Sequence, residues 1–170
     1  TGSAVDGPGV RVVAWTAGCM WRCLYCHNPD TWTMTNGIPV TLARAVEEVG
    51  KYRHGLRVMS GGFTLSGGEA LMQHRFTVKL LAAVRGMGIH TALDTNGSYG
   101  DRLEVGPTLA FARRLAERRR PVWVRFVLVP GWTDDPEEIG GVARFAAGLG
   151  NVERVDVLPF HQMGRFKWRE

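Results

Sequence analysis

The amino-acid sequence predicts an α/β fold in which parallel strands alternate with helices, and three observations support that class. Short apolar runs alternate with longer amphipathic stretches along the whole chain, as expected when each helix crosses over between two parallel strands. Polar and glycine-rich motifs follow the ends of the apolar runs, and parallel α/β folds build their sites at the carboxyl ends of strands. With 170 residues, 45% of them hydrophobic and 22% charged, the chain suits one soluble domain with a sizeable core.

The first half of the chain is predicted to contain two strands and two helices. Residues 10–16 (VRVVAWT) form a buried strand. Residues 41–53 follow as a helix, with Thr41 as its N-cap and a row of apolar side chains on one face. Residues 62–65 are a brief strand, and residues 70–87 are a second helix that stops at the next glycine.

The second half repeats the alternation. Residues 89–93 are strand-like, and Pro107 fits the first turn of a helix that ends before the next proline. Residues 122–129 (VWVRFVLV) form the clearest strand. Thr133, followed by four acidic residues, is predicted to cap a helix, and residues 152–158 are the last strand.

The net charge and the hydropathy of the chain restrict the kinds of partner that the protein is expected to bind. The net charge is +5, and the dense basic cluster at residues 113–120 is interrupted by apolar residues at helical spacing. This favours a solvated helix face over a nucleic-acid surface, while an acidic partner protein or a small anion stays open. No run approaches the about 18 apolar residues of a membrane span, and no secretory signal is visible. The chain opens at Thr1 without a methionine, so a removed leader also stays open. We expect a cytoplasmic protein without nucleic-acid or membrane partners.

All three cysteines, Cys19, Cys23 and Cys26, lie within one short loop. A disulfide framework needs an even number of cysteines spread along a small secreted chain, and this chain offers neither. The trio is therefore expected to be reduced and to act together.

Three kinds of site compete for the trio. CLYCH (23–27) fits a c-type haem motif, but this leaves Cys19 unexplained and requires export. A zinc site could use the three thiolates and His27, although His27 directly follows Cys26 and adjacent side chains rarely bend onto one tetrahedral ion. A [4Fe–4S] cluster uses all three cysteines and leaves its fourth iron open to a substrate or cofactor.

The spacing C-x3-C-x2-C, with an aromatic residue before its last cysteine, resembles the signature of the radical S-adenosylmethionine (SAM) superfamily. Seven motifs, in order along nearly the whole chain, further resemble the pyruvate formate-lyase activating enzymes. These motifs are VDGPGVR (5–11), GCMWRCLYCHNPDTW (18–32), YRH (52–54), SGGEA (66–70), LDTNG (93–97), VWVRFVLVPGWTDD (122–135) and LPFHQMGRFKW (158–168). The stretch between Asn28 and Thr41 is short and lacks cysteine, which favours this branch over activases with a ferredoxin-like insert.

The resemblance implies a partial, open parallel β/α barrel with a cluster bound by Cys19, Cys23 and Cys26. It implies an oxidoreductase of anaerobic metabolism that cleaves SAM to a 5′-deoxyadenosyl radical. That radical takes a hydrogen atom from a glycine Cα of pyruvate formate-lyase. The implied electron donor is a small protein such as flavodoxin or ferredoxin. Two alternatives stay open: an activase of another glycyl-radical enzyme, such as anaerobic ribonucleotide reductase, and a zinc-stabilised binding module.

Residues for the cofactor are expected on several motifs. Gly67 and Gly68 would let backbone approach a ligand closely, and Glu69 could accept a hydrogen bond from the cofactor's ammonium group. Tyr25 and His27 flank Cys26, so they must lie beside the cluster, and the resemblance places them on the adenine and ribose side.

Other residues are expected to contact the cofactor or the substrate peptide. Arg125 lies inside an apolar strand and needs a partner, for which a methionine carboxylate or a peptide carbonyl is suitable. The resemblance implies that His161 contacts cofactor or peptide and that Asp6 contacts the peptide or the cofactor. Asp94 either forms an Asx turn or, by the resemblance, contributes to the cofactor pocket or binds a monovalent cation.

Relatives of this family have a further strand–helix unit with an Asp-x-Lys motif, which would fall between Asn96 and Pro107. Only nine residues, 98–106, separate the LDTNG motif (93–97) from Pro107 here, and loss of the unit would leave neighbouring strands without partners. We therefore expect one radical SAM domain over residues 1–170 from which a segment near Gly100–Asp101 is missing rather than deleted. A closing C-terminal helix is also absent relative to the family.

Overall fold

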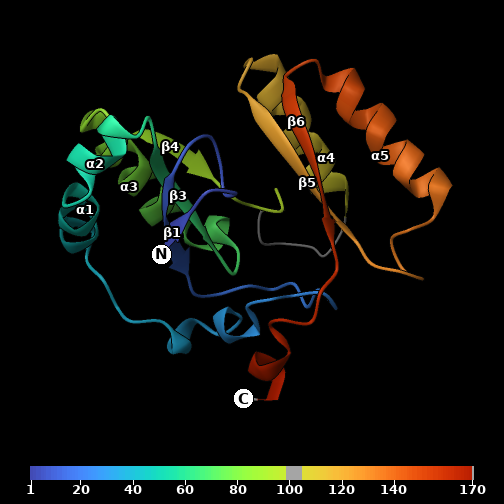
Figure 1. The fold of residues 1–170 in the computed structure, drawn as a ribbon, viewed down its shortest axis with the longest axis horizontal. Coiled ribbons are helices and arrows are strands. Elements are labelled where there is room, and N and C mark those ends of the chain that lie inside the picture. Colours follow the sequence, from blue (N-terminus) through green and yellow to red (C-terminus); the bar gives the residue numbers. More distant parts are fainter. Residues whose placement is uncertain (99–104, 170) are drawn as a thin grey trace. The chain divides into compact units, whose positions relative to one another are not determined.

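The computed structural model describes residues 1–98 and 105–169, which form two compact units (Figure 1). Among the described residues, the first unit contains residues 1–22 and 28–98, and the second contains residues 23–27 and 105–169. The cysteine loop is therefore divided between the two units: Cys19 belongs to the first, and Cys23 and Cys26 belong to the second.

The first unit is built on a sheet with the strand order β1-β2-β3-β4. β2 (Arg11–Thr16), β3 (Gly62–Gly67) and β4 (His90–Leu93) are parallel, and the two-residue β1 (Gly2–Ser3) pairs antiparallel with β2. β3 is the central strand, and its first five residues are buried. Along β3 the apolar Phe63 and Leu65 alternate with the polar Thr64 and Ser66, so one face of the strand is apolar and the other polar although both are buried.

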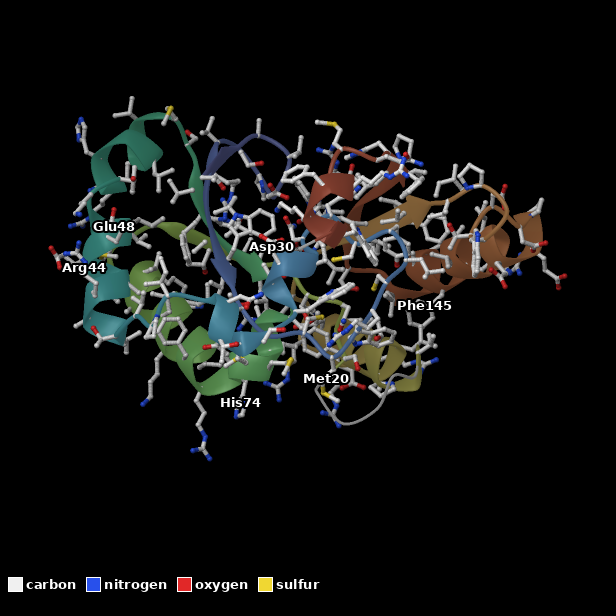
Figure 2. The ribbon with its side chains drawn as sticks, turned by 90° about the horizontal axis from the view of Figure 1, so that it is seen from below. Met20, Asp30, Arg44, Glu48, His74 and Phe145 are labelled. Carbon is white, nitrogen blue, oxygen red and sulfur yellow. The ribbon has the colours of Figure 1, made fainter. Side chains whose placement is uncertain are left out.

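Three helices accompany this sheet: α1 (Leu42–Gly50), α2 (Arg53–Val58) and α3 (His74–Gly86). Figure 1 shows them gathered on one side of it. Their apolar faces and β3 share one hydrophobic core, whose buried members are Val49, Leu56, Phe63, Leu65, Ala70, Leu80, Val84 and Ile89. The opposite face of α1 is charged, and Arg44 and Glu48 lie beside each other on it (Figure 2).

The second unit contains the parallel pair β5 (Val122–Leu128) and β6 (Val152–Pro159) with helices α4 (Val105–Glu117) and α5 (Pro136–Leu149). Figure 1 shows α5 running alongside β6. α4 and α5 also contact each other. The guanidinium of Arg113 lies 5.3 Å from the ring centre of Phe145, close enough for a cation–π pair.

The predicted α/β class and parallel strands are confirmed, and the described strands form open sheets rather than a closed barrel. The polar and glycine-rich motifs GCMWRCLYCHN (18–28), SGGE (66–69), DTNG (94–97), VPGW (129–132) and PFHQMG (159–164) do begin at or just after the end of a strand. The described residues contain no helix that is long and apolar enough to cross a membrane.

Three local predictions were wrong. The helix expected over residues 41–53 is two helices, because the chain turns between α1 and α2. The helix expected from residue 70 begins with a 3-10 turn, Ala70–Gln73, before α3. Thr133 does not cap α5. Its hydroxyl instead accepts from Val129 N and donates to Val127 O, while Asp135 caps the helix by accepting from two backbone amides.

The segment expected to be missing near Gly100–Asp101 falls among residues 99–104, outside the described residues. The described strands on either side of it, β4 and β5, are paired in different sheets.

Candidate functional site

The first cysteine, Cys19, is fixed by backbone contacts within the first unit. Its amide donates to Trp32 O at 3.0 Å, and the guanidinium of Arg22 donates to Cys19 O at 2.7 Å. Arg22 also lies over the Trp32 ring, 4.7 Å from its centre, so one arginine ties both ends of this segment together. Gly18, just before the cysteine, has φ +102° and contacts Met34 so closely that a Cβ would lie 2.3 Å from its sulfur.

The other two cysteines belong to the second unit and form a tight turn. Cys26 N donates to Cys23 O at 3.0 Å. Burial raises the pKa of the Cys23 thiol, and the charge of Cys26 raises it further, while a hydrogen bond from Tyr25 opposes the shift. Burial likewise raises the pKa of Tyr25, with a further contribution from Cys23. A bound cation would favour the Cys23 thiolate and would therefore oppose the rise in the pKa of Cys23.

His27 and His161, two of the predicted site residues, contact each other in the second unit. Their rings stack with centres 4.0 Å apart, and His27 Nε2 lies 3.2 Å from His161 O. His161 follows the end of β6, which places it beside the end of the cysteine loop.

Gly67 and Gly68 are glycines because the chain itself passes close to them. Gly67 has φ +131°, and a Cβ there would lie 2.2 Å from Thr16 N. At Gly68 a Cβ would lie 2.4 Å from Gly18 O. Both contacts are far shorter than a Cβ tolerates, so this motif packs directly against the loop that leads to Cys19.

Glu69 is buried and its carboxylate joins two loops of the first unit. Oε1 accepts from Leu71 N at 2.8 Å and from Thr95 Oγ1 at 2.6 Å, and Oε2 accepts from Asn96 N at 2.9 Å. A carboxylate has about four lone-pair sites, so three protein donors leave room for roughly one more.

Asp94 lies next to this network, at the end of β4. Its Oδ2 accepts from Ser66 Oγ at 2.7 Å, and its amide donates to Leu65 O at 2.9 Å. The Asx turn that was one option for Asp94 is made by Asn96 instead, whose side-chain oxygen accepts from Ser98 N. The motifs after β3 and β4 therefore form one connected cluster around Glu69 and Asp94.

Asp6 lies elsewhere in the first unit. It belongs to the loop between β1 and β2, and its backbone carbonyl accepts from Thr64 Oγ1 at 2.7 Å. This loop precedes the amino end of β2, whereas the cysteine loop and the Glu69 cluster follow carboxyl ends of strands. The structure thus does not bring Asp6 to the Glu69 cluster.

Arg125 lies in the middle of β5 and is half-buried. Its register partner in the parallel β6 is Asp156, which accepts from Arg154 Nε at 2.6 Å. Register partners in parallel strands lie on the same face of a sheet, and so do residues two apart in one strand. The carboxylate of Asp156 and the guanidinium groups of Arg125 and Arg154 therefore share this face. Trp123 lies on it too, since Arg154 is 4.8 Å from the centre of that ring.

Sequence reasoning missed three residues that hold these segments. Arg11 is fully buried and binds the loop before β2, Thr95 donates to Glu69, and Trp168 Nε1 donates to Cys26 O at 3.0 Å. A charged residue at the start of a buried strand was a usable signal for Arg11. The two long-range hydrogen bonds had no local signal.

No group of three or more His, Cys, Asp and Glu side chains stands ready to hold a metal ion in the part of the chain that the structure describes. The donor set of the cysteine loop nevertheless suits iron, because three thiolates with short spacers are typical cluster ligands.

Comparison with known proteins gives concordant results. A family model described as a 4Fe-4S single cluster domain matches residues 5–111. The pyruvate formate-lyase 1-activating enzyme of Escherichia coli (strain K12) is 39% identical over 195 aligned positions, which cover 96% of this chain and 79% of the relative. The pyruvate formate-lyase-activating enzyme of Staphylococcus aureus (strain USA300) is 37% identical over 201 positions, covering 97% and 80%.

Both alignments are longer than the 170 residues of this chain. Each relative therefore contains positions, inside the aligned region, that have no counterpart here.

Proposed function

The chain belongs to the family of pyruvate formate-lyase activating enzymes, and we propose that it uses a [4Fe–4S] cluster and SAM to activate a glycyl-radical enzyme. The observation that carries the proposal is the single loop with C-x3-C-x2-C spacing, which holds every cysteine of the chain, inside a sequence that matches the family from end to end. Pyruvate formate-lyase is the proposed partner, because it is the substrate named for the relatives.

Cys19, Cys23 and Cys26 would hold the cluster and leave one iron open. When bound, a reduced cluster would supply one electron to SAM. Cleavage of the sulfonium–C5′ bond would leave methionine and a 5′-deoxyadenosyl radical, which would take a hydrogen atom from a glycine Cα of the partner. Hydrogen bonds within the chain hold the backbone at Cys19 and Cys26. The hydrogen bond from Tyr25 to Cys23 offsets part of the cost of forming the thiolate there.

The remaining site residues would bind and orient SAM. Glu69 has lone-pair capacity left for an ammonium group, and Asp94 beside it offers a carboxylate for a monovalent cation. Gly67 and Gly68 keep the backbone of this motif tight against the cysteine loop. Tyr25 and His27 would line the adenine and ribose side of the cofactor.

The partner's glycine-bearing peptide is expected to meet Arg125, His161 and Asp6. Arg125 supports a peptide role because a half-buried guanidinium can donate to several carbonyl or carboxylate oxygens. The electron donor would be a small protein such as flavodoxin or ferredoxin, and the compartment would be the cytoplasm, where thiols stay reduced.

Anaerobic reconstitution with iron and sulfide tests this function. We expect about four irons and four sulfides per chain, and formation of 5′-deoxyadenosine from SAM once a reductant is added. Addition of pyruvate formate-lyase should give a glycyl radical by electron paramagnetic resonance, and anaerobic ribonucleotide reductase serves as the competing partner. Zinc bound without sulfide would identify a binding module instead.

Single substitutions provide the control. Cys19→Ala, Cys23→Ala and Cys26→Ala should each lose the cluster and all 5′-deoxyadenosine formation, because no other cysteine in the chain can replace the missing ligand. A single variant that keeps activity would contradict the three-ligand site.

A further inference from the structure

The end of the cysteine loop is held by a segment far along the chain. Residues 160–168 follow β6 and contact Cys26 and His27 within the second unit. The segment is itself anchored, since Phe160 N donates to Leu128 O at the end of β5. We call residues 160–168 the C-terminal clamp.

The first contact is made by Trp168, whose indole Nε1 donates to Cys26 O at 3.0 Å. This carbonyl belongs to the peptide plane between Cys26 and His27. Fixing that plane restricts ψ of Cys26, and with it the direction in which the cysteine side chain leaves the backbone. Trp168 stands 142 positions away from Cys26 in the chain, so the bond forms only when the second unit is folded.

The second contact is made by Gly164, which is buried against the backbone of His27. A Cβ at this position would lie 2.8 Å from His27 O and 3.0 Å from His27 Cα. The third contact is the stack of His161 on His27. The indole, the glycine and the ring therefore all contact Cys26 or His27.

A short turn structure sets the spacing of these three groups. A 3-10 turn covers Arg165–Arg169. At its start, Arg165 N donates to Gln162 O at 3.0 Å and Lys167 N donates to Gly164 O at 3.1 Å. The turn allows the indole to reach a carbonyl beside the glycine contact.

We infer that the C-terminal clamp positions Cys26 for cluster binding, with Trp168 as a positioning residue that acts through the Cys26 carbonyl. The inference rests on the proposed function, because it takes Cys26 as a cluster ligand. It extends that function by assigning a role to Trp168, which contacts the backbone of Cys26, and to Gly164, which contacts the backbone of His27.

The test compares Trp168→Phe with Trp132→Phe in the reconstituted full chain. The first change keeps an aromatic ring but removes the donor, and the second alters a tryptophan that is 69% exposed in the loop after β5. We expect Trp168→Phe to release iron to a chelator about fivefold faster, the effect of losing one hydrogen bond, with Trp132→Phe unchanged. The reduced cluster of Trp168→Phe should also show an altered paramagnetic resonance spectrum.

Gly164→Ala and Gly148→Ala form a second matched pair. The added methyl of Gly164→Ala meets the His27 backbone, whereas a Cβ at Gly148 in α5 meets nothing within 4 Å. Gly164→Ala should accelerate iron release as well, and Gly148→Ala should not.

Three results would overturn the inference. One is iron release from both clamp variants at the parent rate. Another is a loss of metal-free stability, in urea, that accounts for the whole change in iron release, since this would make the clamp only structural. The third is failure of the unaltered chain to bind iron and sulfide, which would overturn the proposed function and the inference with it.

Discussion

Arg11 is a charged residue without any exposed surface. Burial lowers its pKa from the ordinary value, yet its donors are satisfied by Thr64 Oγ1 at 2.9 Å, Pro8 O at 3.1 Å and Phe63 O at 2.6 Å. His90 Nδ1 lies 3.0 Å from the same guanidinium. One side chain therefore joins the loop before β2 to the neighbouring strands β3 and β4.

Replacing Arg11 by Met should be strongly destabilising. Arg11→Met keeps the aliphatic length but leaves several buried acceptors without a donor, and we expect it to lower the free energy of unfolding by about 3 kcal/mol. Urea denaturation measures the difference. Arg85→Met, on the exposed side of α3, is the control and should change stability little. Equal effects of the two substitutions would show that the hydrogen bonds of Arg11 contribute nothing.

The cysteine loop could be predicted from the sequence because a cluster uses all three cysteines and because six other motifs support the same family resemblance. The partners that hold them could not. Arg22 and Trp32 lie near Cys19 in the chain, but the contact between Trp168 and Cys26 depends on the turn at the end of the chain. For the same reason, sequence reasoning offered Glu69 as a cofactor contact without seeing that it already binds Thr95.

At the scale of elements, the carboxylate of Glu69 links the loops after β3 and β4. Glu69→Gln replaces one acceptor oxygen by a donor, so at least one buried N–H or O–H loses its partner. We expect a loss of about 2 kcal/mol in the metal-free protein. Thr95→Val removes a single donor and should cost less, about 1 kcal/mol.

A double-mutant cycle separates this link from general destabilisation. If Glu69 and Thr95 act through their shared hydrogen bond, the double variant should be about 1 kcal/mol more stable than the sum of the single effects predicts. Urea unfolding of the four proteins gives the coupling, and Glu117→Gln at the exposed end of α4 is the control. Strictly additive effects would contradict a direct link.

The charged face of α1 predicts a pH dependence. The pKa of Glu48 is lowered from its ordinary value of 4.5, mainly by the hydrogen bond from Lys51, with Arg44 also nearby. A lowered carboxyl pKa in the folded state contributes stability above the unfolded pKa, and the contribution disappears as pH falls through the folded pKa.

Lys51→Met should therefore be less stable than the parent near pH 7 but equal to it well below pH 4.5. Urea midpoints across this pH range measure the difference, which salt should reduce because the pair is exposed. Lys79→Met on α3 is the matched control. A difference that stays constant from neutral to acidic pH would rule out the carboxylate as the cause.

Periodicity predicted the type of most elements, and tertiary context set their boundaries. The five predicted strands are present because each is either an apolar run or an alternation of apolar and polar residues. β1 was missed because a pair of small residues, Gly2 and Ser3, has no strand signal by itself and pairs only through β2. Asp135 was not predicted as the N-cap of α5 because Thr133 is also a residue that commonly caps helices. The hydroxyl of Thr133 is instead occupied by its hydrogen bonds with Val127 O and Val129 N.

At the scale of the whole molecule, two observations concern the stretch between β4 and β5. These strands follow each other among the described elements but are paired in different sheets. The alignments with both relatives also extend over more positions than the chain has. Both observations support our proposal that a strand–helix unit is missing between Asn96 and Pro107.

Restoring that unit tests the proposal. The stretch of the Escherichia coli relative that lies between the counterparts of Asn96 and Pro107 would be inserted between Gly100 and Asp101. Because an added strand pairs with open strand edges and buries apolar surface, the free energy of unfolding and its dependence on urea should both rise. SAM should also bind more tightly, since the resemblance assigns part of the cofactor's binding to an Asp-x-Lys motif in this unit.

A Gly/Ser linker of the same length is the control, because it adds chain without strand pairing or an apolar face. Closing a longer flexible loop costs only about 0.6 kcal/mol per doubling of its length, so the linker variant should be slightly less stable than the parent. A relative's segment that performs no better than the linker, in both stability and SAM binding, would show that the 170-residue chain is complete at this point and that its sheets need no further strand.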